Sequence, residues 1–276
     1  MPILISTSEL ADQLRDPALV IADVRWDPSD PEAAINSYRQ GHIPGAIYFD
    51  LDRDLSDRSD LSRGRHPLPD PHDFAQLLMR RGIGPDTRLV VYDDKLESLA
   101  VRLWWMMRWI GGPEAALLDG GLDKWVHERR PIEEGPDRDL RPAHRAISVN
   151  LNPSLIARIT EIESASRGGM VLLDARAPER YRGEVEPIDT RAGHIPAAVN
   201  APWTENLSGT TPQVFKSPAE LRSHYEKLGV TSGADVVCYC GSGATACHDV
   251  FALGLAGFHR VRLYPGSWSE WIAQHP

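Results

Sequence analysis

The chain has 276 residues, of which 42% are hydrophobic and 25% are charged, an ordinary composition for a soluble globular protein. This length exceeds one typical domain and predicts two domains of about 130 residues each. The net charge of −9 leaves no surplus of lysine and arginine to neutralise phosphates, which excludes nucleic acid and an anionic membrane as main partners. A small anionic substrate is compatible with this charge, because a few local arginines suffice to bind it.

Neither the N-terminal stretch nor the cysteines of the chain indicate secretion. The N-terminal stretch "MPILISTSELADQL" lacks a basic segment followed by a long apolar run, so we expect no secretory signal. The most apolar window, "LAVRLWWMMRWIGG", is short and carries two arginines, so we expect no membrane-spanning helix. All three cysteines lie between positions 238 and 247, which provides no disulfide framework. These features predict a cytoplasmic protein.

Four sequence blocks of the first half return in the same order in the second half, at an offset of about 150 residues. The paired blocks are 19–27 with 170–181, 41–52 with 193–204, 82–94 with 229–240, and 115–125 with 261–271. Short runs rich in Val, Leu and Ile alternate with longer helical patterns, which is typical of parallel strands joined by helices. With five strand candidates in each copy, the pattern predicts two tandem doubly wound α/β domains.

The stretch "PIEEGPDRDLRPAHR" separates the two copies. It is rich in proline and charge and has no hydrophobic period, which predicts a linker at residues 131–145. The first domain is then expected at residues 1–130 and the second at 146–276.

In each copy, an apolar run ends in an aspartate followed two residues later by an arginine. We expect Asp23 with Arg25, and Asp174 with Arg176, to form internal ion pairs that shape the domains.

The stretch "VVCYCGSGATACHDVFALGL" places Cys240 where a buried strand gives way to a turn of small residues. Ligands of such folds bind beyond the carboxyl ends of the strands, and a helix is expected at residues 245–255. Loop amides and a helix N-terminus favour a thiolate and then an anionic sulfur adduct on that thiolate. The amides expected to line this turn belong to Gly241, Gly243, Ala244 and Thr245. The alternative is that Cys240 is a small buried hydrophobic residue.

The first copy has no cysteine at the matching position, which falls on Asp93 or Asp94. Only the second copy is therefore expected to carry thiol chemistry.

The motifs "DARAPERYRG", "GHIP", "YCGSGAT" and "YPGSWSEW" together resemble the two-domain rhodanese sulfurtransferases, and the resemblance covers nearly the whole chain. It implies two similar α/β domains, each a mostly parallel five-stranded sheet flanked by helices, of which the second is catalytic. It also implies that the thiolate takes a sulfane sulfur from a small anionic donor, becomes a persulfide, and passes the sulfur to a thiol or to cyanide. No metal or organic cofactor is expected, and the chain is expected to be a monomer or a homodimer.

The identity of the donor depends on the residues that follow Cys240. In this family, thiosulfate-preferring members usually carry a basic residue directly after the cysteine, whereas the loop "CGSGAT" is more typical of 3-mercaptopyruvate members. Gly241 and Ser242 provide no charge here, so the sequence slightly favours 3-mercaptopyruvate.

By the same resemblance, Arg180 in "ERYRG" is expected to bind the donor's carboxylate or sulfonate in a bidentate manner. Arg182 is expected either to assist or to be a solvated surface residue. Mercaptopyruvate members often have a second substrate arginine farther along, where this chain has Asp189. Arg191, two residues later, is a substitute candidate.

A serine–histidine–aspartate relay is also proposed for the mercaptopyruvate members. The resemblance maps its serine onto Ser242 and its histidine onto His42. The alternative for His42 is a turn histidine that bonds the backbone, because His194 occupies the same turn in the second copy.

Four alternatives to this function concern the same cysteines. A cysteine phosphatase needs an arginine six residues after its cysteine, where this chain has Ala246. A zinc site would have to use Cys238, Cys247 and His248, which lack a recognisable ligand spacing, and a regulatory disulfide among the three cysteines is the remaining redox alternative. A non-enzyme alternative is a persulfide carrier that delivers sulfur to a protein partner through the same Cys240.

Overall fold

The computed structural model describes residues 3–27, 29–30, 32–96, 98–137, 141–165 and 168–275, and the chain divides into two compact units. The first unit comprises residues 1–57, 68–152 and 210–214, and the second comprises 58–67, 153–209 and 215–276. Each half of the sequence thus lends one short segment to the other unit. The domain limits expected from the sequence, 1–130 and 146–276, do not take these two segments into account and stay a prediction. Residues 138–140 of the expected linker, 131–145, lie outside the described residues.

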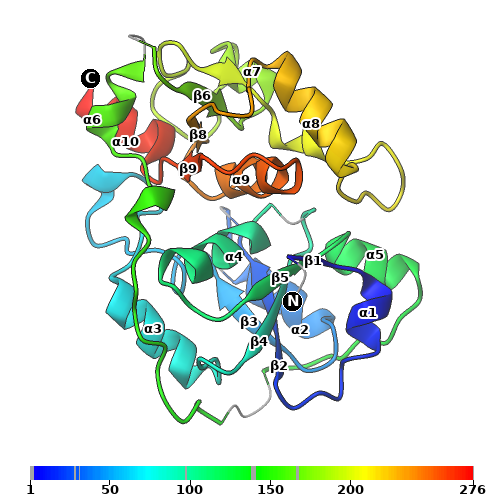
Figure 1. Cartoon of the computed structure of the whole chain (residues 1–276). Helices are drawn as coiled ribbons and strands as arrows, with labels where there is room; N and C mark the ends of the chain where they lie inside the picture. The colour runs from blue at the N-terminus through cyan, green and yellow to red at the C-terminus, as the bar shows by residue number, and fades with distance from the viewer. Residues whose placement is uncertain are drawn as a thin grey trace. The chain divides into compact units, whose positions relative to one another are not determined.

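The first unit contains a parallel five-stranded sheet in the order β1-β5-β4-β2-β3 (Figure 1). Its β2 and β4 are buried almost throughout, as expected for central parallel strands covered on both faces. Its strands are β1 (Leu4–Ile5), β2 (Leu19–Arg25), β3 (Ala46–Asp50), β4 (Arg88–Tyr92) and β5 (Ala115–Leu118). Its helices are α1 (Thr7–Ala11), α2 (Ala33–Gln40), α3 (Pro71–Arg80), α4 (Ala100–Trp109) and α5 (Gly121–His127).

The second unit contains a parallel four-stranded sheet in the order β7-β6-β8-β9. A single parallel bridge from Ile156 to Leu263 takes the place of the expected fifth strand. The strands are β6 (Val171–Asp174), β7 (Val199–Asn200), β8 (Val236–Tyr239) and β9 (Val261–Leu263). The α-helices are α6 (Ile159–Ile162), α7 (Pro178–Tyr181), α8 (Pro218–Lys227), α9 (Ala246–Leu255) and α10 (Ser267–Gln274). The short 3₁₀ helices are η1 (Leu61–Arg63), η2 (Pro153–Leu155) and η4 (Trp203–Asn206).

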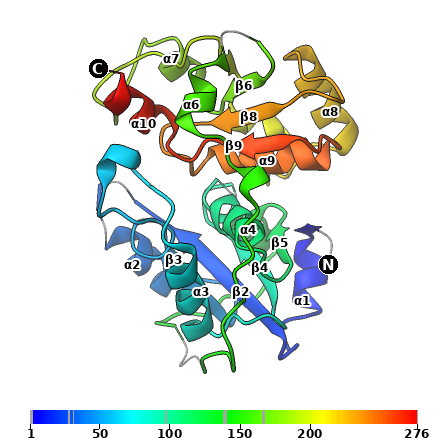
Figure 2. The same cartoon turned by 60° about the vertical axis from the view of Figure 1, so that its left-hand side comes forward.

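Helix α9 packs against the sheet of the second unit. It contacts β8, β9 and α8, and eight of its ten residues are buried (Figure 2). Such a helix, apolar on nearly every side, is stable only inside a protein core. Within the described ranges, no helix is both long and apolar enough to cross a membrane. The expected class, two tandem α/β domains with parallel sheets, is confirmed, with one strand fewer in the second sheet.

The duplication is visible in the buried polar contacts of the two units. The expected ion pairs are present. Nη2 of Arg25 lies 2.7 Å from Oδ2 of Asp23, and Nη2 of Arg176 lies 2.7 Å from Oδ2 of Asp174. In both units the arginine also donates to the backbone carbonyl of the Gly-His-Ile-Pro turn, over 2.8 Å and 2.6 Å. Each buried pair therefore ties the end of a central strand to the turn that leads into its neighbour.

We expect Arg25→Met to lower the free energy of unfolding by about 3 kcal/mol, because the fully buried Asp23 would lose its charge partner. Urea denaturation followed by tryptophan fluorescence measures the change. The control is Arg39→Met, which alters an exposed arginine of helix α2 in the same unit. Equal effects of the two substitutions would contradict a structural role for the buried pair.

Candidate active site

Cys240 directly follows β8, and helix α9 begins at Ala246, close to the expected start at residue 245. Cys240 is almost fully buried, with 2% of the residue exposed. The backbone amide of Cys240 donates to Ser267 Oγ over 3.1 Å, and its carbonyl accepts from the amide of Trp268 over 3.0 Å. The first turn of α10 thus holds the main chain of the cysteine in place.

The turn after Cys240 aims a backbone amide at the sulfur. The N–H of Gly243 donates to Cys240 Sγ over 3.1 Å. Gly243 has a φ of +79°, and a Cβ atom there would lie only 2.2 Å from the carbonyl oxygen of Pro265. Only glycine fits this position, because it adopts a positive φ without strain and brings no side chain. A negative charge on sulfur is stabilised by such an amide.

Two guanidinium groups lie beside Gly241, the residue after the cysteine. A Cβ atom on Gly241 would be 2.8 Å from Nη2 of Arg65 and 3.5 Å from Nη2 of Arg180. Arg180 was expected here, but Arg65 was not. Arg65 belongs to the segment 58–67 of the second unit, where its amide donates to Ser269 Oγ over 3.0 Å.

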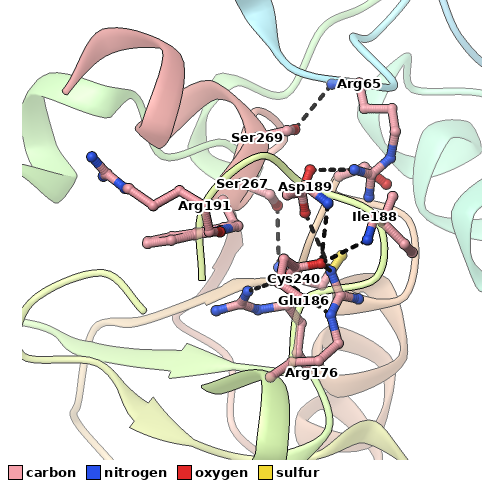
Figure 3. A network of polar contacts seen from close by, with 12 residues as sticks. Arg65, Arg176, Glu186, Ile188, Asp189, Arg191, Cys240, Ser267 and Ser269 are labelled. Carbon is pink, nitrogen blue, oxygen red and sulfur yellow. Dashed lines mark hydrogen bonds and ion pairs between the residues drawn. The ribbon is translucent and has the colours of Figure 1, made fainter. Parts of the chain in front are cut away.

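Two carboxylates hold these arginines (Figure 3). Asp189 pairs through Oδ1 with Arg65 and through Oδ2 with Arg180, the latter over 3.2 Å. Glu186 accepts from Arg180 over 2.6 Å and from Arg176 over 3.3 Å. Burial raises the pKa of Asp189, although Arg65 acts in the opposite direction. Burial also acts to raise the pKa of Glu186, but hydrogen bonds from Arg180 and from two backbone amides outweigh it, so this pKa is lowered.

The hydroxyl of Ser242 has a histidine partner, His66, whose Nδ1 lies 2.7 Å from Ser242 Oγ. Both residues are buried, and His66 comes from the same segment as Arg65. The family resemblance predicted His42 for this relay, and His66 was not among the expected residues. In the sequence, His66 stands in "SRGRHP", outside the four repeated blocks, so no comparison between the copies points to it.

His42 instead makes the contacts of a turn histidine. Its Nδ1 lies 2.9 Å from the carbonyl oxygen of Tyr38, and its ring stacks on that tyrosine with 4.0 Å between centroids. His194 repeats this arrangement on Tyr181: its Nδ1 lies 2.8 Å from the carbonyl oxygen of Tyr181, and the two ring centroids are 3.9 Å apart. The shared geometry matches the alternative stated for His42, a structural role in the turn.

The other two predicted arginines are engaged elsewhere. Arg182 is 53% exposed and pairs with Glu184 over 2.7 Å, as a solvated surface residue does. The guanidinium of Arg191 lies 5.5 Å from the ring centre of Trp268, and it donates to the carbonyl of His275. Figure 3 shows this side chain turned away from Cys240.

Ala244 and Thr245 directly precede helix α9. Their carbonyl oxygens accept from the amides of Cys247 over 3.1 Å and His248 over 3.0 Å. The described contacts thus give these two residues a part in starting the helix, and the sulfur contact falls to Gly243.

The remaining cysteines, Cys238 and Cys247, are buried in the core and are not joined by a disulfide. Cys238 is fully buried in β8, and burial raises its pKa well above the usual value, which keeps it a neutral thiol. Cys247 Sγ lies 3.5 Å from the carbonyl oxygen of Gly243, and His248 Nδ1 lies 3.1 Å from Nδ2 of Asn206. Over the ranges that the structure describes, no three His, Cys, Asp or Glu residues are grouped as metal ligands.

The strand registers identify the counterpart of Cys240 in the first unit. Asp23 pairs with Tyr92 as Asp174 pairs with Tyr239, so Asp93 occupies the position of the cysteine. Its carboxylate accepts the amides of Lys95, Leu99 and Ala100 over 2.7, 2.8 and 2.9 Å. Burial raises the pKa of Asp93 to about 6. The amides of this loop therefore donate their hydrogen bonds to the carboxylate of Asp93, a side chain of the loop itself.

Comparison with known proteins agrees with this geometry. A family model described as the rhodanese-like domain matches residues 6–128 and 159–274. The "Probable 3-mercaptopyruvate sulfurtransferase" of Pseudomonas aeruginosa is 42% identical over 98% of this chain and 94% of its own length. A Mycobacterium tuberculosis relative, provisionally named thiosulfate sulfurtransferase SseB, is 40% identical over 98% of this chain and 93% of its own. The crystal structure of SseA from Escherichia coli, in a study of 3-mercaptopyruvate sulfotransferases, matches with a TM-score of 0.84 and 33% identity, covering 97% of this chain and 99% of SseA.

We expect Gly243→Ala to slow alkylation of Cys240 by iodoacetamide at least about tenfold, because the loop would have to move its amide away from the sulfur. The alkylation rate is followed by mass spectrometry of the peptide that contains Cys240. The control is Gly254→Ala in helix α9, where an added Cβ meets nothing within 4 Å. An unchanged rate in Gly243→Ala would show that the turn does not activate the thiol.

Proposed function

This chain belongs to the rhodanese family and is a sulfurtransferase, and we propose that Cys240 takes a sulfane sulfur from 3-mercaptopyruvate and passes it to a thiol or to cyanide. The observation that carries this proposal is the amide of Gly243 on Cys240 Sγ, at 3.1 Å. That contact favours a thiolate as the nucleophile and afterwards a persulfide in the same turn. In the first unit, Asp93 occupies the matching position, and we propose that this unit has no sulfur-transfer activity of its own.

The donor binds through its carboxylate to the guanidinium groups of Arg180 and Arg65. Both lie beside Gly241, so a carboxylate held there presents its neighbouring atoms to Cys240. Paired guanidinium groups fix the orientation of a carboxylate as well as its position, because their N–H donors are arranged in a planar fork. Orientation matters here, since the thiolate has to approach the donor's sulfur along the carbon–sulfur bond.

In the transfer step, the Cys240 thiolate attacks the donor's sulfur. A sulfur–sulfur bond forms, the carbon–sulfur bond breaks, and its electron pair stays on carbon as the enolate of pyruvate. The proton of the donor's thiol neutralises that enolate, which leaves pyruvate and a deprotonated persulfide on Cys240. An acceptor thiolate or cyanide then attacks the outer sulfur and releases the Cys240 thiolate.

Ser242 and His66 serve the leaving enolate. When His66 carries a proton on Nδ1, it donates to Ser242 Oγ, and the serine's own proton is then available to the donor's carbonyl oxygen. Negative charge develops on that oxygen as the carbon–sulfur bond breaks. A serine hydroxyl that is already positioned to donate a hydrogen bond to the oxygen therefore stabilises the transition state. We therefore assign the relay histidine to His66, while His42 keeps its contact with Tyr38.

Two features favour 3-mercaptopyruvate over thiosulfate. The residues after Cys240, Gly241 and Ser242, carry no charge for the second negative group of thiosulfate. The Ser242–His66 pair also matches a donor with a carbonyl group, which thiosulfate lacks. A persulfide carrier without turnover needs neither the arginines beside Gly241 nor this pair, so the geometry supports the enzyme over the carrier. A cytoplasmic location and a monomeric or homodimeric state stay predictions from the sequence.

We expect Cys240→Ser to abolish sulfur transfer from 3-mercaptopyruvate to cyanide, because the hydroxyl of serine is a far weaker nucleophile than a thiolate. Thiocyanate formation measures turnover, and a mass increase of about 32 Da on Cys240 detects the persulfide in the natural protein. The matched control is Cys247→Ser, in which another buried thiol of the same unit is replaced. If Cys240→Ser retains turnover, Cys240 is not the nucleophile.

We expect His66→Gln to lower kcat with 3-mercaptopyruvate about 100-fold, because it removes the partner of Ser242. Turnover of thiosulfate should change much less, since its leaving group has no carbonyl oxygen to polarise. His42→Gln and His194→Gln, at equivalent turns, should affect both donors alike and resemble each other. A donor-specific loss in His42→Gln, with His66→Gln unaffected, would return the relay to His42.

A further inference from the structure

Asp189 places a negative charge where the proposed function requires a donor's carboxylate. Its two oxygens lie on Arg65 and Arg180, the same guanidinium groups that flank Gly241 (Figure 3). Oδ2 of Asp189 is itself 3.5 Å from the position of a Cβ on Gly241. The side chain of Asp189 is 5% exposed, so it is packed inside the site and shielded from solvent.

The charges of this network cancel. Three guanidinium groups face three carboxylates, and the residues are Arg65, Arg176, Arg180, Asp174, Glu186 and Asp189. A balanced network has no surplus positive charge with which to attract an anion. An anionic donor therefore binds well only after one of the three carboxylates withdraws from its arginines.

Asp189 is the carboxylate that is held least firmly. Asp174 is fully buried and accepts from Arg176 through both oxygens. Glu186 accepts five hydrogen bonds, two of them from backbone amides, and its pKa is lowered. Among the described residues, the side chain of Asp189 has the two arginines as its partners, and burial raises its pKa.

Asp189 lies on the loop between α7 and β7, where no helix or strand is formed from residue 182 to residue 198. Two neighbours on the same loop, Val185 and Ile188, are about half exposed, at 50% and 47%. The amide of Asp189 donates to Glu186 Oε1 over 3.1 Å, so its backbone is attached to the firmly held carboxylate. The exchange at the arginines therefore requires the side chain of Asp189 to turn away from them, while its backbone stays in place.

We propose that Asp189 is an internal competitor for the donor's carboxylate: it holds Arg65 and Arg180 until a donor arrives, and the donor's carboxylate then replaces it. This inference rests on the proposed function. Because the competing group is part of the chain, its effective concentration is high, and the apparent affinity for every anionic donor is reduced.

The same exchange selects among donors by charge. When the donor's carboxylate replaces that of Asp189, one negative charge replaces another and the network stays balanced. Thiosulfate brings two negative charges into the same place, so it leaves one negative charge without a partner. Asp189 therefore favours donors with a single carboxylate over inorganic dianions.

The test is steady-state kinetics of Asp189→Asn with both donors. We expect KM for 3-mercaptopyruvate to fall at least about tenfold, or about 1.4 kcal/mol, with kcat within about twofold of the natural protein. For thiosulfate, kcat/KM should rise by a larger factor, because the network gains a positive charge. The matched control is Glu184→Gln, which removes one negative charge from the same segment at the exposed pair with Arg182. Its KM values should stay within about twofold.

A higher or unchanged KM for 3-mercaptopyruvate in Asp189→Asn overturns the proposal, because Asp189 would then position the arginines or play no part in binding. Asp189→Ala provides a second variant in case the asparagine variant folds poorly, and circular dichroism checks both. Turnover by the natural protein and its loss in Cys240→Ser test the proposed function separately. Calorimetry with pyruvate, which has the carboxylate and no sulfur, tests the competition without turnover. Equal pyruvate affinities of Asp189→Asn and the natural protein would also overturn it.

Discussion

The proposed chemistry depends on a backbone turn that brings an amide to a sulfur atom. The N–H of Gly243 reaches Cys240 Sγ only because Gly243 adopts a positive φ and lies directly against the carbonyl of Pro265. Pro265 in turn leads into α10, whose first turn accepts and donates the hydrogen bonds of the Cys240 backbone. The reactive thiol is therefore held by two loops that pack on each other with no room for a side chain between them.

The duplicated fold shows what the same turn does without a thiol. In the first unit, Asp93 stands in the place of Cys240 and supplies the negative charge that its loop amides need. Both units keep the buried Arg–Asp pair at the end of the neighbouring strand. The pair belongs to the fold, whereas the proposed function assigns sulfur transfer to one residue after the central strand, which is a cysteine in the second unit and an aspartate in the first. In this proposal, structure and catalysis rest on different residues of the same repeat.

The parts of the candidate site that depend on local pattern could be predicted from the sequence. Cys240, the glycine turn and the beginning of α9 follow from one continuous stretch, and Arg176 follows from the repeat. His66 and Arg65 could not be found in this way. His66 is separated from Ser242 by 176 residues, and it belongs to a segment that the repeat leaves out. Arg191 is close to the candidate site in sequence, but its guanidinium lies 5.5 Å from the ring centre of Trp268, and its role in donor binding stays a prediction.

The segments that the two halves of the sequence lend to each other's units make the two copies interdependent. Residues 58–67 complete the second unit with Arg65 and His66, while residues 210–214 belong to the first, where Gln213 lies against Gly120. The half of the sequence without a cysteine thus supplies side chains to the unit that contains Cys240. Neither half of the sequence, cut between residues 137 and 153, would contain all the segments of its own unit. The two copies are therefore expected to fold as one chain and to be incomplete when they are separated.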